Sequence, residues 1–172
     1  MPLLTVKIVK ALKKVLVTLM AVMVLDVTWQ IFTRFILKNP SSYTEELAGF
    51  LLIWIGLLGA SYALYTRAHL GIDILTSRLE GRQKQMAEIA IYFITLLFAL
   101  FVMVIGGANL VSITYSLRQI SPAMGIPMSY VYVVLPLSGL LMMYFSVVSI
   151  SDTIQRKPDA GASVQNFKTI DL

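Results

Sequence analysis

Residues 47–65 read LAGFLLIWIGLLGASYALY, a stretch of 19 residues without a charged side chain. A helix of about 20 apolar residues crosses a hydrocarbon core of about 30 Å, so this stretch is predicted to span a membrane. Three further apolar runs, at residues 15–37, 87–117 and 128–150, are separated from it and from one another by charged connectors. The chain is therefore predicted to be an all-α integral membrane protein. It has four transmembrane helices in a single membrane domain over residues 1–172, with a tail at 151–172.

The composition excludes several classes of protein. Of 172 residues, 58% are hydrophobic and 13% are charged, against about 25% charged residues in an average soluble domain. With no cysteine and one histidine, a Cys-ligated zinc or iron–sulfur site and a bis-histidine haem are excluded, and no cofactor is expected in this chain. The net charge of +5 comes from basic residues at the ends of the apolar runs. That placement favours contact with membrane lipids over nucleic acid.

The distribution of lysine and arginine predicts the orientation of the helices. Eleven of the 14 basic residues lie at the N-terminus, between the second and third runs, or in the tail. Only Lys38 and Arg118 lie in the other two connectors, and Arg34 lies inside the first run. Since cytoplasmic loops are enriched in lysine and arginine, both termini are predicted to be cytoplasmic. The connectors at residues 38–46 and 118–127 then face outwards; the second is called the external loop below.

Two segments have amphipathic patterns next to the cytoplasmic surface. Residues 71–85 place apolar side chains at helical spacing, which predicts a short interfacial helix between the second and third spans; a polar linker is the alternative. Residues 5–14 are either a second interfacial helix or a simple extension of the first span. The third run would be about 46 Å long as a straight helix, so it should tilt, protrude or bend near Gly106-Gly107. Pro136 is expected to kink the fourth run.

Three polar residues interrupt the first run at intervals of four, namely Asp26, Gln30 and Arg34. On a helix they form one stripe, and a charge at the bilayer centre costs about 2.5–3.5 kcal/mol on insertion scales. Such groups face protein or water. The stripe is therefore either a proton or ion site, or an interhelical contact that fixes this helix against a neighbour, in this chain or another.

The second run carries the most distinctive pattern. Thr44 is a candidate N-cap, and Glu45 and Glu46 complement the helix dipole or contact a partner. Trp54 lies deep in the run, so its indole N–H needs a partner within protein. Small residues, Gly49, Gly56 and Gly59 with Ala60 and Ser61, predict a surface that another helix can approach closely.

Two further features flank the spans. His69 and Asp73 are four residues apart just after the second run. Such a pair is either a proton relay or, since no nucleophile or metal ligand lies nearby, a structural hydrogen bond. The external loop contains two prolines and a glycine, so it is expected to be ordered. Its residues Arg118, Gly125, Ile126 and Pro127, with Met128, are candidates for contact with a soluble partner.

Residues 45–60, EELAGFLLIWIGLLGA, followed by His69, Ile72 and Asp73, resemble the small membrane subunit of TRAP transporters, the tripartite ATP-independent periplasmic transporters. A second, weaker match is Gly125-Ile126-Pro127 with Tyr132 and Leu135-Pro136. The matching positions Glu45, Glu46, Trp54, Gly59, His69 and Asp73 are then mostly structural.

The resemblance implies a bacterial inner-membrane subunit that is not an enzyme. A large multi-helix membrane subunit would carry the substrate and sodium sites, and a periplasmic substrate-binding protein would deliver an organic acid, such as a C4-dicarboxylate or a sialic acid. This chain would brace the large subunit and help to dock the binding protein. Two alternatives are a self-sufficient proton-coupled exporter acting as a homodimer through Asp26, and a membrane enzyme using His69 and Asp73.

Overall fold

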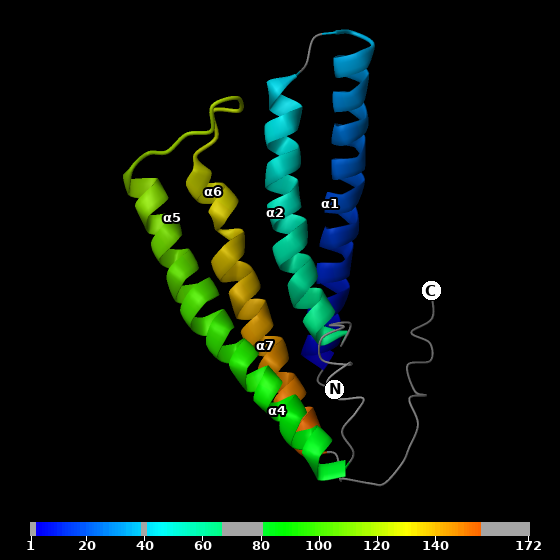
Figure 1. The fold of residues 1–172 in the computed structure, drawn as a ribbon, viewed down its shortest axis with the longest axis vertical. Coiled ribbons are helices and arrows are strands. Elements are labelled where there is room, and N and C mark those ends of the chain that lie inside the picture. Colours follow the sequence, from blue (N-terminus) through cyan, green and yellow to red (C-terminus); the bar gives the residue numbers. More distant parts are fainter. Residues whose placement is uncertain (1–2, 39–40, 67–80, 156–172) are drawn as a thin grey trace.

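The computed structural model describes residues 3–38, 41–66 and 81–155, which are almost entirely helical (Figure 1). Four helical stretches are long and apolar enough to cross a membrane. The first two are α1 (Leu3–Phe35) and α2 (Ser42–Tyr65). The third is built from α4 (Gly81–Phe98), the π-helix η1 (Ala99–Gly106) and α5 (Gly107–Ser116), and the fourth from α6 (Met128–Tyr132) and α7 (Val134–Gln155). The all-α, four-span prediction is confirmed.

The helix bounds differ from the predicted ones mainly at the ends that were predicted to be cytoplasmic. Helix α1 begins at Leu3, so residues 5–14 extend the first span and do not form a separate interfacial helix. Residues 81–85, the end of the predicted amphipathic segment, are the first turn of α4. The rest of that segment, residues 71–80, lies outside the described residues, as do His69 and Asp73.

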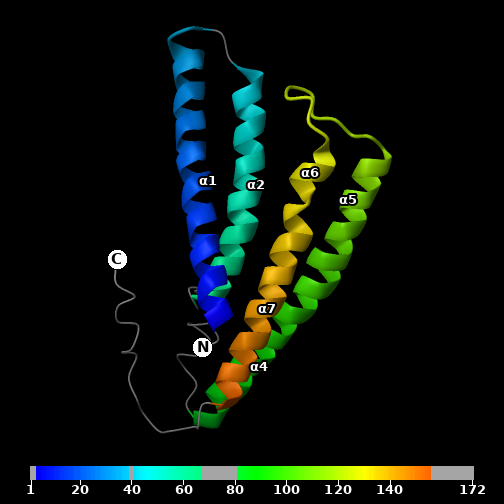
Figure 2. The ribbon, with the colours of Figure 1, turned by 180° about the vertical axis from the view of Figure 1, so that it is seen from behind.

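The helices pack as a layer in the order α1, α2, α6–α7 and α4–η1–α5 (Figures 1 and 2). Neighbours in this order make the main interhelical contacts, and the α1–α2 hairpin diverges from the other pair towards the connecting loops. The buried core lies where α2, α4 and α7 meet, around Leu64, Tyr92 and Phe145. At the same end, the hydroxyl groups of Thr5 and Tyr144 are hydrogen-bonded at 2.8 Å and join α1 to α7.

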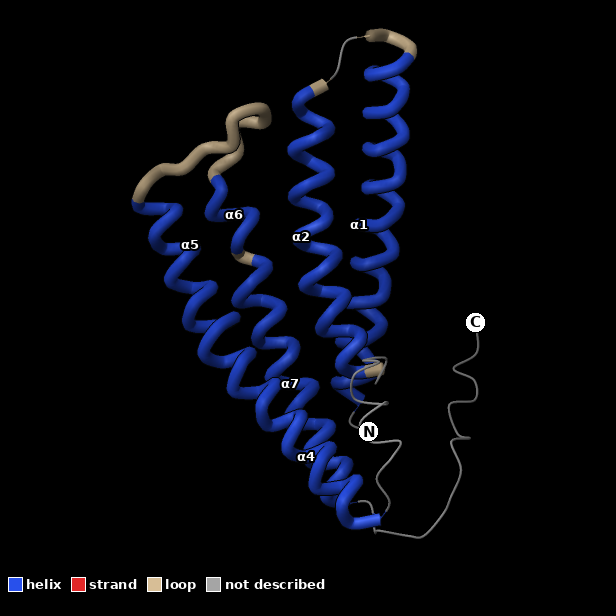
Figure 3. The backbone as a smooth tube through the Cα atoms, viewed as in Figure 1, coloured by secondary structure: helices blue, strands red, loops and turns tan. Residues whose placement is uncertain are grey.

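Both long spans of the second hairpin are irregular at the same depth. The π-helical segment ends at Gly106, where the bend was predicted. The fourth span is interrupted at Val133, the non-helical link in Figure 3. Pro136 has no N–H to give to the carbonyl of Tyr132, which accounts for a break at this point.

Glycines allow the two irregular spans to approach each other. A Cβ on Gly107 would lie 2.9 Å from Cβ of Leu135 and 3.0 Å from Cδ of Pro136. A Cβ on Gly139 would lie 2.8 Å from Cβ of Met103. Each helix therefore places a glycine against bulky side chains of the other, which fixes the closest approach of the two spans.

Candidate functional site

Three side chains of α2 hydrogen-bond to the main chain of the segment that forms the external loop, α6 and α7. Glu46 accepts a hydrogen bond from the N–H of Ala123. Trp54 donates to the carbonyl of Val131, and Ser61 donates to the carbonyl of Ser138. Each pair is separated by 77 residues. The constant offset means that α2 and the α6–α7 span run parallel in one register. Intervals of seven and eight residues are two helical turns, so the three side chains share one face of α2.

The outermost contact holds the external loop. One carboxylate oxygen of Glu46, Oε2, accepts hydrogen bonds of 2.9 Å from the main-chain N–H groups of Ala123 and Met124. The Ser121 hydroxyl is a further hydrogen-bond partner of this carboxylate. Hydrogen bonds to an ionised acceptor are stronger than neutral ones. Glu46 therefore fastens the tip of the loop to the start of α2, towards which the loop turns in Figure 1.

The external loop is ordered by its own hydrogen bonds as well. The N–H of Ser121 donates to the carbonyl of Ile126 at 2.9 Å, and the N–H of Met128 donates to the carbonyl of Gln119 at 2.9 Å. Gly125 adopts a φ of +68°, which a glycine reaches without steric cost, and its N–H donates to Ser121. Arg118 also has a positive φ, of +48°, directly after α5.

The loop presents several side chains outwards. Arg118, Gly125 and Pro127 are exposed, while Ile126 and Met128 are half-buried. The five candidate docking residues therefore lie on one short, braced segment.

Trp54 makes the middle contact of the interface. Its indole Nε1–H donates to the carbonyl of Val131 at 3.1 Å, the protein acceptor that a tryptophan at this depth needs. Val131 is itself 5% exposed and lies in α6, just before the interruption at Val133.

Ser61 makes the innermost contact and is fully buried, at 0% exposure. Its hydroxyl is 3.1 Å from the carbonyl of Leu57 in its own helix and 3.2 Å from the carbonyl of Ser138 in α7. Ser138 is also fully buried, and its hydroxyl bonds back to Leu135. Small side chains at both positions let α2 and α7 approach closely, because neither carries bulk beyond Cβ and a hydroxyl.

The glycines of α2 lie on a face that is open. A Cβ added at Gly49, Gly56 or Gly59 would meet no atom within 4 Å. Gly49 and Gly56 are exposed, as are Leu52 and Ile53 on the same side of the helix. The glycine part of the predicted small-residue surface is therefore unoccupied by the described part of this chain, whereas Ser61 packs against α7.

The predicted acidic pair separates into two roles. The N-cap of α2 is Ser41, not Thr44. Thr44 lies inside the first turn, and its hydroxyl donates to the carbonyl of Ser41 at 2.8 Å. Glu45 is exposed, whereas Glu46 is half-buried against the loop. The dipole-capping interpretation thus omits the main contact of Glu46, which is with a segment far away in sequence.

The side chains of the Asp26 stripe become more exposed along α1, from Asp26 to Arg34. Asp26 is 9% exposed and its Oδ2 has no hydrogen-bond partner within the described residues. Gln30 is half-buried and Arg34 is exposed, so the three polar groups do not form one cluster. Thr33, which the stripe did not include, is buried and bonds to the carbonyl of Gln30 at 3.0 Å.

Ser61 belongs to the small-residue surface predicted for the second run, whereas Ser138 was not identified from the sequence, and neither serine was assigned a hydrogen bond. Their signal is faint, since one serine within an apolar run is compatible with a lipid-facing or a buried position. The recurrence of polar side chains at Glu46, Trp54 and Ser61, two turns apart, is the pattern that points to them.

Residues 11–156 match the family model described as tripartite ATP-independent periplasmic transporters, DctQ component. A C4-dicarboxylate TRAP transporter small permease protein of Rhodobacter capsulatus is 34% identical over 107 residues, which cover 59% of this chain and 44% of the relative. This chain therefore aligns with less than half the length of that protein.

Two other relatives extend the comparison. A sialic acid TRAP transporter small permease protein of Vibrio cholerae is 27% identical over 139 residues, covering 80% of this chain and 79% of the relative. An isethionate TRAP transporter permease protein of Oleidesulfovibrio alaskensis is 31% identical over 136 residues, which are 76% of this chain and 21% of that longer protein. These relatives are transporter proteins, not enzymes.

Proposed function

The chain belongs to the DctQ component family of TRAP transporters, the small permease subunits, and we propose that it braces a large transport subunit in the membrane. It is a multi-pass protein of the bacterial inner membrane. Small permease subunits of this family work with a large permease subunit. That large subunit, in this proposal, carries the substrate and sodium sites and imports an organic acid of the C4-dicarboxylate or sialic acid type.

The open face of α2 is the observation that carries this proposal. One side of the helix is fixed to α6–α7 by three side-chain hydrogen bonds, another side packs on α1, and the face that carries the glycines has free space beside it. Close packing against small residues is a main source of helix association in lipid. We assign the surface formed by Gly49, Gly56 and Gly59 as the contact for a helix of the large subunit.

The external loop supports a second part of the proposal. Glu46 holds the loop in one conformation, with Arg118, Gly125 and Pro127 exposed beyond the spans. A preformed loop loses little conformational freedom when it binds a soluble protein. In the predicted orientation it faces the periplasm, where a substrate-binding protein would dock on it.

The brace is tested by enlarging the open face. Gly56→Leu should reduce the amount of large subunit that co-purifies with this chain from its native membrane, and should reduce sodium-dependent uptake to the same extent. Ala21→Leu is the matched control, because it adds similar bulk at an exposed position of α1. Undiminished co-purification of Gly56→Leu would refute this face as the contact. Purification of the unmodified chain as a lone homodimer would refute the brace itself.

A further inference from the structure

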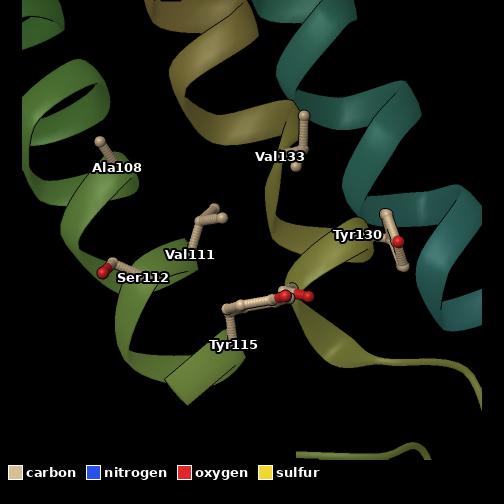
Figure 4. A pocket seen from close by; sticks show the side chains of 7 residues that line it. Ala108, Val111, Ser112, Tyr115, Tyr130 and Val133 are labelled. Carbon is tan, nitrogen blue, oxygen red and sulfur yellow. The ribbon is translucent and has the colours of Figure 1, made fainter. Parts of the chain in front are cut away.

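A groove opens between α5 and α6 near the external end of the second hairpin (Figure 4). Its volume is about 310 Å³. It is lined by one face of α5 and the first turn of α6, with residues Ala108, Val111, Ser112 and Tyr115 opposite Ser129 and Val133. Tyr130 lies on its rim. No part of the proposed brace or docking loop uses this groove.

The groove changes in polarity along its length. Aliphatic side chains, those of Ala108, Val111 and Val133, line its deeper part, and Figure 4 shows Val111 directed into the gap between the two helices. Tyr115 lies in the last turn of α5, and Ser129 and Tyr130 lie in the first turn of α6. Residues with hydroxyl groups therefore line the external end, the level at which tyrosine is enriched in membrane proteins.

The inner end of the groove is closed. Gly107, one residue before Ala108, lies so near Leu135 and Pro136 that a Cβ added to it would be 2.9 Å from Cβ of Leu135. A docked helix is about 10 Å wide and needs a channel open along its length. A narrow groove with an apolar closed end and a hydroxyl-rich mouth suits a hydrocarbon chain that carries a polar group at one end.

A positive charge lies at the same level as the mouth. Arg118 follows Tyr115 by three residues, its N–H donates to the carbonyl of Tyr115 at 3.1 Å, and its side chain is exposed. Arginine is well suited to phosphate because its planar guanidinium offers several N–H donors. We propose that the groove holds one acyl chain of an outer-leaflet phospholipid, with the phosphate at the level of Tyr115 and within reach of Arg118.

The proposal is tested by measuring bound lipid. The complex is reconstituted in dioleoyl phosphatidylglycerol vesicles, extracted into a mild detergent, washed, and examined by native mass spectrometry. One retained phospholipid is expected for the natural sequence and is expected to be lost in Val111→Trp, which fills the groove. Ile113→Trp is the matched control, since Ile113 is exposed on α5 but does not line the groove. Arg118→Gln should also lower retention.

Three results would overturn the proposal: no retained lipid, a lipid lost equally from Val111→Trp and Ile113→Trp, or a lipid retained by both. If Val111→Trp does not fold, Ala108→Leu tests the same volume with less bulk. A benzophenone photocrosslinker at Val111 identifies the occupant directly. Its capture of phospholipid supports the proposal. If the crosslinker instead captures the large subunit, which could contact the exposed Asn109 on the adjacent face, the lipid proposal is overturned while the proposed brace is unaffected.

Discussion

The indole N–H of Trp54 donates to the main-chain carbonyl of Val131 at 3.1 Å, joining the middle of α2 to the short helix just before the break in the fourth span. The same separation of 77 residues relates Glu46 to Ala123 and Ser61 to Ser138. Each α2 side chain bonds to a main-chain group, so these hydrogen bonds require no particular polar side chain at Ala123, Val131 or Ser138. The register of the α6–α7 span along α2 thus depends on three residues of α2.

Replacing Trp54 by phenylalanine tests the middle contact. Trp54→Phe keeps an aromatic ring in place but removes the N–H donor, so the free energy of unfolding should fall by about 0.6–1.7 kcal/mol, the range for interhelical hydrogen bonds in membranes. The midpoint of thermal unfolding in detergent is the measurement. Trp29→Phe is the control, because the Trp29 ring is exposed and stacks on Phe32. Equal losses of stability in the two variants would contradict a special role for Trp54.

Neutralising Glu46 should release the external loop. In Glu46→Gln the amide oxygen accepts more weakly than a carboxylate, because hydrogen bonds to a charged acceptor are stronger than neutral ones. Hydrogen–deuterium exchange at the amides of Ala123 and Met124 should therefore speed up. Glu45→Gln is a close control, since it removes the neighbouring charge from an exposed side chain. Unchanged exchange in Glu46→Gln would show that the loop is held by its internal hydrogen bonds alone.

Adjacent glycines in the third span should respond differently to a methyl group. Gly107→Ala would place Cβ 2.9 Å from Leu135, and overpacking of this kind costs about 1–3 kcal/mol. Gly106→Ala meets nothing closer than the carbonyl of Phe101 at 3.6 Å, so it should be tolerated. Thermal unfolding of the two variants side by side measures the difference. Similar stabilities would mean that α5 shifts away from α7 at little cost.

Asp26 distinguishes the subunit from an autonomous proton-coupled exporter. Its Oδ2 has no partner within the described residues, so Asp26→Asn removes no hydrogen bond made by that atom. We expect this variant to retain assembly with the large subunit and sodium-dependent uptake, because transport is assigned to the partner. Uptake by the reconstituted pair is the measurement. Loss of uptake with assembly intact would make Asp26 part of the transport mechanism.

The number and length of the spans were predictable because a bilayer imposes a simple requirement. Each span needs about 20 apolar residues, and a run such as residues 47–65 meets it regardless of its neighbours. The need of Trp54 for a partner and the interruption before Pro136 also follow from local chemistry, namely an indole N–H at depth and the missing proline N–H. The π-helical segment does not, because it begins at Ala99, and Gly106 and Gly107 both have regular helical dihedral angles. The apolar pattern alone therefore determined an all-α protein with four spans.

The tertiary structure decided what these residues contact. A carboxylate at a helix start is equally consistent with capping and with a long-range bond, and only the return of the chain 77 residues later brings Ala123 to Glu46. The uniform apolarity of the spans likewise does not distinguish a face of α2 packed on α7 from the face with Gly56, because lipid and protein interior are both apolar. The sequence by itself determined the spans, and helix packing determined which face was left open, since packing depends on shape rather than on hydrophobicity.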